Sequence, residues 1–169
     1  MRRSGVLLPV TSLPSRFGIG TFSKEAYAFV DFLKEAGQKL WQILPLGPTG
    51  YGDSPYQAFS TFAGNPYLID LEELIENGWL TEEECENTDW GGSKSYVDYE
   101  KMYQGRFPLL RKAYHNSHIA ENAEFIAFCE ENDWWLSDYA LFMAIKDSQG
   151  GASFLEWDAP LKLREPEAI

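Results

Sequence analysis

Residues 39–60 read KLWQILPLGPTGYGDSPYQAFS, and two kinds of sequence meet in this stretch. Residues 39–46 form a short and mostly apolar run, which is typical of a buried β-strand. Residues 47–60 hold three glycines, two prolines, two tyrosines and two serines. Gly and Pro are too frequent in this second part for it to form a helix or a strand. The stretch therefore predicts a strand followed at once by a long irregular loop that carries aromatic rings.

The predicted strand closes a βαβ unit that begins near the amino terminus. Residues 5–10 form a first apolar strand, and Ser23 and Gly37 are placed to begin and end a helix. Apolar residues recur at helical spacing between these two ends: Ala26, Phe29, Val30, Leu33 and Ala36. Strands joined by such a crossover run parallel, so we expect residues 6–10 to pair with residues 40–44.

The loops that follow the two strands, residues 11–22 and 47–69, exceed the roughly 2–6 residues usual for such connections. Ligands of parallel α/β folds bind on loops at the carboxyl ends of strands. Gly18 and Gly20 resemble the start of a dinucleotide fingerprint, but Ser23 stands where its third glycine belongs, and no acidic residue ends the second strand. Glycines that serve a turn are therefore preferred over a nucleotide site.

The loop after the second strand suits a sugar ligand. Tyr51 and Tyr56 offer flat faces for the C–H surface of a sugar ring, and Asp53 and Ser54 offer partners for hydroxyl groups. A second interpretation has equal weight from spacing alone. In it, the loop covers a small satellite core made of Tyr51, Tyr56, Phe59 and Phe62.

Composition narrows the class of protein. The 169 residues are 44% hydrophobic and carry a net charge of −12, which allows one domain with a core but opposes nucleic acids and anionic membranes. The first apolar run contains Pro9 and lacks a cleavage site, so it is a strand rather than a signal peptide. No run could span a membrane. Cys85 and Cys129 are far apart and indicate free thiols of a cytoplasmic protein.

Three segments together resemble a known enzyme family. They are SLPSRFGIGTF at residues 12–22, WQILPLGPTGYGDSPYQAFSTFAGNPYLIDL at residues 41–71, and EWDAPLKLR at residues 156–164. They are similar to the amino-terminal third of the amylomaltases, the 4-alpha-glucanotransferases or disproportionating enzymes. The resemblance implies a (β/α)₈ barrel with inserted subdomains. It also implies an enzyme that cuts an α-1,4-glucan, holds the glycosyl part covalently and passes it to an acceptor sugar.

The resemblance sets the expected architecture. The fold class is α/β, an incomplete (β/α)₈ TIM barrel that starts with two parallel strands and carries a mainly α-helical inserted subdomain. We expect residues 1–69 to be the barrel portion with its glucan-binding loop, residues 70–150 the helical insert, and residues 151–169 a return segment toward the barrel. A complete barrel of this class needs about 250 residues, so the chain is expected to be an amino-terminal part of such an enzyme.

The resemblance also sets the expected site. Tyr56 and Ser54 contact glucan near the cleavage point, and Tyr51 makes accessory contacts. Retaining chemistry needs a nucleophile and an acid/base carboxylate, but none of the 26 acidic residues matches the family's catalytic motifs. We therefore assign no catalytic residue, no metal and no cofactor, and expect the isolated chain to be inactive without the remainder of the barrel. The expected partner is an α-1,4-glucan or maltooligosaccharide.

Two interpretations from other classes stay open. One is a non-catalytic carbohydrate-binding module that uses the same aromatic loop. The other is an acidic helical interaction module.

Helix signals dominate after residue 69. Asp70 and Thr81 are N-cap residues with Glu73 and Glu84 at capping-box positions. Residues 98–114 have helical spacing but contain Gly105 and Pro108, which predicts two pieces or one kinked helix.

The last part of the helical region predicts an αα-hairpin. Residues 119–131 and 134–147 form its arms, and Asn132 and Asp133 form the turn between them. The expected facing core is apolar: Phe125, Phe128, Cys129, Trp135, Tyr139, Phe142 and Ile145. His115 and His118 have metal-like spacing without further ligands, which indicates solvated loop histidines.

Overall fold

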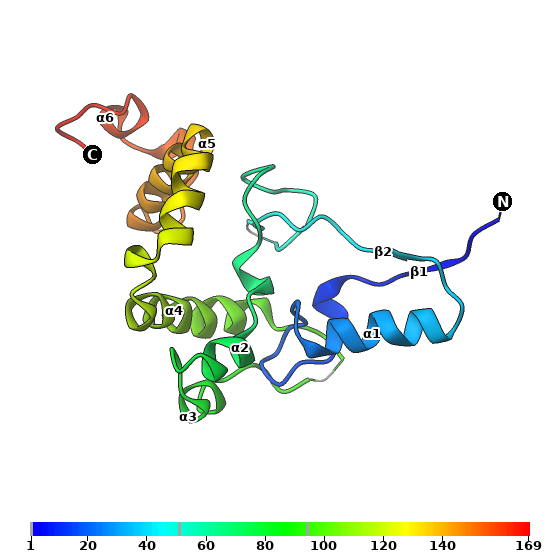
Figure 1. Cartoon of the computed structure of the whole chain (residues 1–169). Helices are drawn as coiled ribbons and strands as arrows, with labels where there is room; N and C mark the ends of the chain where they lie inside the picture. Colours follow the sequence, from blue (N-terminus) through cyan, green and yellow to red (C-terminus); the bar gives the residue numbers. More distant parts are fainter. Residues whose placement is uncertain (1, 51, 94) are drawn as a thin grey trace. The chain divides into compact units, whose positions relative to one another are not determined.

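The structure, a computed structural model, describes residues 2–50, 52–93 and 95–169. The chain divides into two compact units, one that ends at Ile119 and one that runs from Ala120 to Ile169 (Figure 1). The described residues are mostly helical, and a pair of strands lies in the first unit. The boundaries at residues 69/70 and 150/151 stay predictions.

The two strands pair in parallel, as predicted. β1 (Gly5–Leu7) and β2 (Leu40–Gln42) align Gly5 with Leu40 and Leu7 with Gln42. Both strands are shorter than expected. Pro9 has no N–H to continue the ladder, and Val10 already belongs to the 3₁₀ turn η1 (Val10–Ser12). β2 ends where its pairing with β1 ends.

The helix between the strands begins and ends where the sequence indicates. α1 (Lys24–Glu35) is capped by Ser23, whose Oγ accepts a bond from the Glu25 N–H at 3.3 Å, and Gly37 follows with φ of 70°. Figure 1 shows α1 alongside β1 and β2. One apolar cluster joins these elements to the first loop; its buried members are Val10, Leu13, Ala26 and Leu68.

Short helices follow the second loop. η2 (Pro66–Leu68) leads into α2 (Leu71–Glu76) and α3 (Glu82–Glu86). The predicted N-caps are confirmed at Asp70, which accepts from the Glu72 N–H, and at Thr81. A complete capping box forms between Thr81 and Glu84, but not between Asp70 and Glu73. A second apolar cluster packs these helices against the first loop and α4; its buried members are Phe17, Leu71, Leu80, Cys85, Leu109 and Ala113.

α4 (Tyr99–Ser117) is one helix that continues through Pro108. It buries one face, made of Met102, Arg106, Leu109 and Ala113. Burial of this face offsets the hydrogen bond that Pro108 removes. His115 lies in the last turn and His118 caps the helix, so the two histidines are exposed but are not on a loop as predicted.

The predicted αα-hairpin is wrong. Residues 123–148 form a single helix, α5 (Ala123–Ser148), with η3 (Ile119–Glu121) before it and η4 (Phe154–Glu156) and α6 (Ala159–Lys162) after it. Asn132 donates to the Phe128 carbonyl at 2.8 Å, and Asp133 accepts from the Ser137 hydroxyl. These i, i+4 bonds satisfy both polar side chains inside a helix, so they form no turn.

The expected facing core of the hairpin is correspondingly absent. Of its seven residues only Ile145 is buried, and Phe128 is exposed. The second unit instead gathers rings around the buried Trp157, with Phe142 and Phe154 centroids each 5.3 Å away.

Candidate functional site

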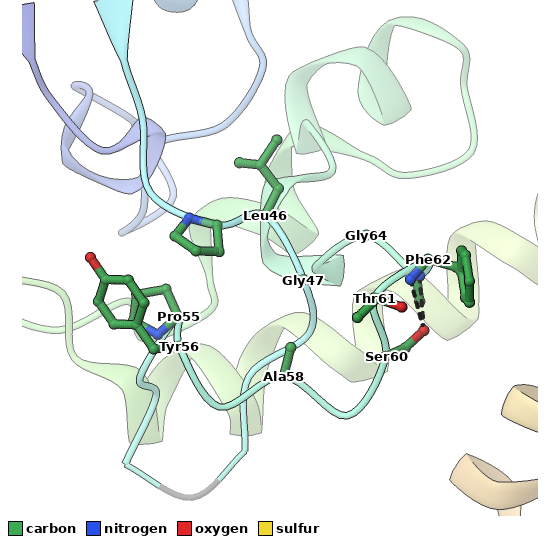
Figure 2. Close-up of a pocket in the computed structure, with 11 residues that line it drawn as sticks. Leu46, Gly47, Pro55, Tyr56, Ala58, Ser60, Thr61, Phe62 and Gly64 are labelled. Atoms are coloured by element: carbon green, nitrogen blue, oxygen red, sulfur yellow. Dashed lines mark hydrogen bonds between the residues drawn. The ribbon is translucent and has the colours of Figure 1, made fainter.

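The candidate site is the loop that leaves β2. A hollow of about 570 Å³ lies along it and is lined by residues 45–47, 55–56, 58 and 60–64 (Figure 2). Tyr56 and Phe62 stand toward opposite ends of this hollow in Figure 2. Its walls combine apolar side chains with hydroxyl groups of Ser60 and Thr61. This mixture suits a neutral ligand that has both apolar faces and hydroxyls.

Backbone bonds close the base of the loop. The Asn65 N–H donates to the Leu46 carbonyl at 2.8 Å, so the two ends of the loop lie side by side. The Ser60 hydroxyl oxygen accepts from the N–H groups of Phe62 and Ala63, each at 3.1 Å (Figure 2). Local hydrogen bonds therefore help to hold the shape of the loop around the hollow.

The tip of the loop consists of two successive turns. The Asp53 N–H donates to the Gly50 carbonyl at 3.0 Å, and the Gln57 N–H donates to the Ser54 carbonyl at 3.1 Å. Asp53 lies at the junction with φ of 50°, in the left-handed region. Its Oδ1 accepts a bond from the Thr49 hydroxyl at 3.1 Å.

The structure brings two of the three predicted binding residues together. Tyr56 lines the hollow with 74% of its surface exposed, and its N–H donates to the Ser54 hydroxyl oxygen at 3.4 Å. Ser54 is half-buried beside it and does not line the hollow. Tyr51 lies outside the described residues. The binding roles of Tyr51, Ser54 and Tyr56 stay predictions.

The satellite-core interpretation is wrong for the rings that the structure describes. Tyr56 is 74% exposed, Phe62 58% and Phe59 39%. Three rings with such exposure do not form a buried cluster beneath the loop. The loop therefore presents aromatic surface instead of packing it.

Asp53 acts electrostatically on two phenols, the buried Tyr67 and the half-buried Tyr99. Burial raises the pKa of Asp53, and the Thr49 bond partly opposes this rise. Burial also raises the pKa of Tyr67 and of Tyr99, and the negative charge of Asp53 raises both further. The centroids of these two rings are 6.0 Å apart. The tip of the loop thus carries its charge toward η2 and the first turn of α4.

Arg106 is a buried cation that the sequence analysis missed. It is fully buried on α4 and donates through Nη2 to the Ile69 carbonyl, while its Nε and Nη1 have no hydrogen-bond partner among the described residues. Burial lowers its pKa to about 10, and Asp70 opposes this. The available signal was spacing: Arg106 follows Met102 by four residues and precedes Leu109 by three, so it shares their helix face.

The loop after β1 holds no nucleotide cradle. A side chain at Gly20 would collide with the Val10 carbonyl and with Leu13, and one at Gly18 would collide with Met102. The two glycines therefore permit close packing of the chain on itself, in agreement with the preferred interpretation.

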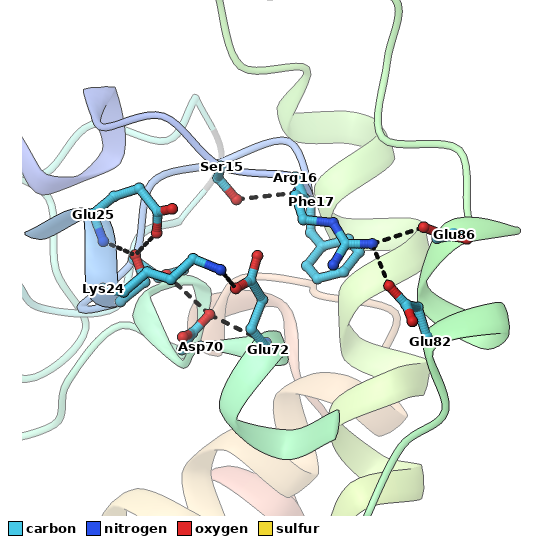
Figure 3. A network of polar contacts seen from close by, with 11 residues as sticks. Ser15, Arg16, Phe17, Lys24, Glu25, Asp70, Glu72, Glu82 and Glu86 are labelled. Carbon is cyan, nitrogen blue, oxygen red and sulfur yellow. Dashed lines mark hydrogen bonds and ion pairs between the residues drawn. The ribbon is translucent and has the colours of Figure 1, made fainter. Parts of the chain in front are cut away.

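Ion pairs join the first loop and α1 to the short helices (Figure 3). Arg16 bridges Glu82 at 2.6 Å and Glu86 at 2.7 Å, and Lys24 pairs with Glu72. Both basic side chains are exposed, so water screens these pairs and their contribution to stability is small.

The described residues contain neither a metal-binding cluster nor a membrane-spanning helix. No group of three His, Cys, Asp or Glu side chains in residues 2–50, 52–93 and 95–169 could hold a metal ion. Within the same ranges, no helix has the length and apolar character needed to cross a membrane.

Comparison with known proteins defines the class. A family profile described as 4-alpha-glucanotransferase, glycoside hydrolase family 77, matches residues 8–169. The chain belongs to this family, which confirms the resemblance seen in residues 12–71.

Individual relatives agree with the family. The chain is 49% identical to a 4-alpha-glucanotransferase of Thermus thermophilus over 99% of its own length and 33% of the relative. It is 48% identical to the enzyme of Clostridium butyricum over 95% of its length and 33% of the relative. An amylomaltase from Streptococcus agalactiae in complex with acarbose matches with a TM-score of 0.91 and 47% identity, over 99% of this chain and 34% of that one. The chain spans about a third of the length of these relatives.

Proposed function

We propose that this chain acts within a 4-alpha-glucanotransferase, which moves segments of α-1,4-glucan to acceptor sugars by retaining double displacement. The observation that carries the proposal is 47–49% identity to 4-alpha-glucanotransferases and an amylomaltase over 99% of the chain. The comparisons give no support to a separate carbohydrate-binding module or to an acidic interaction module.

The proposed architecture follows from the same likeness. β1, α1 and β2 form the first part of a (β/α)₈ barrel, residues 70–150 an inserted helical subdomain, and residues 151–169 a return toward the barrel. The candidate site supports this placement, because the loop lies after the carboxyl end of a parallel strand, where such barrels bind ligands.

The proposed ligand of the hollow is an α-1,4-linked oligosaccharide. The solved relative holds acarbose, and the hollow of this chain offers an exposed Tyr56 ring and the Ser60 and Thr61 hydroxyls. A ring face suits sugar C–H groups, and hydroxyls exchange hydrogen bonds with sugar hydroxyls. We assign Tyr56 and Ser54 to the sugar beside the cleaved bond and Tyr51 to an accessory contact.

The chemical step needs groups that this chain is not assigned. Retaining transfer uses a nucleophilic carboxylate and an acid/base carboxylate about 5–5.5 Å apart. No residue of the chain is placed in either role, so its part is to bind and orient the glucan while the remainder of the barrel supplies the carboxylates.

The net charge of −12 opposes nucleic acids and anionic membranes as partners. Free Cys85 and Cys129 support a cytoplasmic location.

Incubation with maltotriose tests the function. The complete product of the gene that encodes this chain should release glucose and form longer maltodextrins, whereas the purified 169-residue chain should form neither. Failure of the complete product would refute the transferase. Turnover by the isolated chain after removal of trace host enzymes would refute the proposal that the remainder of the barrel supplies the catalytic carboxylates.

A further inference from the structure

Asp53 lies between two backbone hydrogen bonds of the loop tip, one that ends at its own N–H and one that begins at the Ser54 carbonyl. The first turn ends at its N–H, the second begins at Ser54, and the backbone at Asp53 is left-handed. A change of φ at this junction would rotate the second turn, with Ser54 and Tyr56, relative to the first. We propose that Asp53 is a positioning residue that sets the placement of Ser54 and Tyr56 for the ligand. This inference rests on the proposed function of the loop.

The side chain of Asp53 reinforces the backbone. Its Oδ1 accepts from the Thr49 hydroxyl at 3.1 Å, which closes a ring across the first turn. Asp and Asn adopt the left-handed conformation more readily than other residues that carry a side chain, because their short polar groups bond locally. Two features of one residue, its backbone preference and its bond to Thr49, therefore hold the same junction.

The position costs stability, which favours a functional reason for it. A non-glycine residue in the left-handed region carries backbone strain, and such strain gathers at ligand sites. The carboxylate is half-buried beside Tyr67 on η2 and Tyr99 on α4, and no ion pair with it occurs among the described residues. Burial raises its pKa, because taking the charged carboxylate out of water is unfavourable. A neutral side chain at this position would therefore cost the loop less stability than the carboxylate does.

The backbone preference of Asp53 and its bond to Thr49 together predict which substitutions are tolerated. Asp53→Asn keeps the left-handed preference and the acceptor for Thr49, so Ser54 and Tyr56 should stay in place. Asp53→Ala loses both features. Thr49→Val keeps the shape of residue 49 and removes only the hydrogen bond, so it should fall between the two.

Nuclear magnetic resonance of this chain tests the positions directly. Asp53→Ala should move the amide signals of Ser54 and Tyr56, while Asp53→Asn leaves them near their wild-type places. Amides of the distant α4 residues Leu109 and Ala113 should be unchanged in both and so report an intact fold. Unmoved Ser54 and Tyr56 amides in Asp53→Ala, or equal movement in Asp53→Asn, would overturn the inference.

Kinetics of the complete gene product test the consequence. Asp53→Ala should lower kcat/KM for maltotriose about fivefold or more, with Asp53→Asn within about twofold of wild type. Added to Tyr56→Ala, the Asp53→Ala change should cost less than it costs the wild-type product, because only Ser54 is then left to be displaced. Fully additive effects would overturn the inference. If the wild-type product neither binds nor transfers glucan, the proposed function fails, and the amide signals alone decide the positioning role.

Discussion

Two loops follow the two parallel strands of this chain, and the structure uses them in opposite ways. The loop after β1 is folded into the core, where Phe17, Ile19 and Thr21 are each at most 3% exposed. The loop after β2 leaves Tyr56 and Phe62 more than half exposed. Both are long and rich in glycine, so length and glycine content do not distinguish a structural loop from a binding loop.

Both loops close hydrogen bonds of their own, so the difference lies in where their side chains pack. The first loop packs apolar side chains against α1, α4 and the short helices, and it contributes residues to three buried clusters of the first unit. The second loop closes its own hydrogen bonds, at Leu46, Gly50, Ser54 and Ser60. A loop that is held by local bonds can keep its aromatic rings in water, where a ligand can reach them.

The largest expected difference between the two loops is the effect of removing one aromatic ring from each on the free energy of unfolding. Phe17→Ala should lower the free energy of unfolding by about 3–5 kcal/mol, because it leaves a cavity in a buried cluster. Phe62→Ala should change it by less than about 1 kcal/mol, because that ring is 58% exposed. Urea unfolding followed by far-ultraviolet circular dichroism measures both. Similar losses for the two variants would contradict the contrast between the loops.

Arg106 gives the next largest effect. Arg106→Ala should cost about 3 kcal/mol, since it removes a buried side chain and leaves the Ile69 carbonyl without its donor. Arg106→Met keeps much of the volume and removes a buried charge, so its cost should be within about 1 kcal/mol. Thermal unfolding of the two variants gives the comparison. Equal destabilisation would show that the lost charge and the lost bond to the Ile69 carbonyl matter more than the lost volume.

The exposed loop should respond in activity rather than in stability. Tyr56→Ala in the complete gene product should lower kcat/KM about tenfold or more, near 1.4 kcal/mol of transition-state binding. Tyr51→Ala should have a milder effect, seen mainly with long glucans. Melting temperatures measured in parallel provide the control. A Tyr56→Ala variant that loses stability but keeps its kinetics would assign the ring to packing.

The smallest effect concerns pH. Burial raises the pKa of Asp53, so the native state holds this proton more tightly than the unfolded state. The stability of the wild type should therefore fall as the pH rises from the ordinary value of an Asp through the raised one. Asp53→Asn removes this loss and should raise the melting temperature at pH 7 by about 1 °C.

The matching control for this variant is acidic pH. Below the ordinary pKa of an Asp, the carboxyl is protonated in both states, so the gain from Asp53→Asn should vanish. A gain that persists there would have another cause.

The sequence by itself determined the features that depend on near neighbours or on long similarity. The parallel strand pair, the caps at Ser23, Asp70 and Thr81, and the family were all predicted. A cap is a bond between residues two or three apart, so its partners are visible in the sequence. The family was recognisable because a motif of 31 residues, from Trp41 to Leu71, is too specific to arise by chance.

Tertiary structure decided the rest. Asn132 and Asp133 suggested a turn, but bonds to residues one helical turn away keep them inside α5. Arg106 shares a face of α4 with Met102 and Leu109, but its spacing alone did not show that this face would be buried. The exposure of Tyr56 and the burial of Phe17 depend on which segments pack against each loop, and those segments are distant in the sequence. Burial is a property of the folded chain, and composition alone does not specify it.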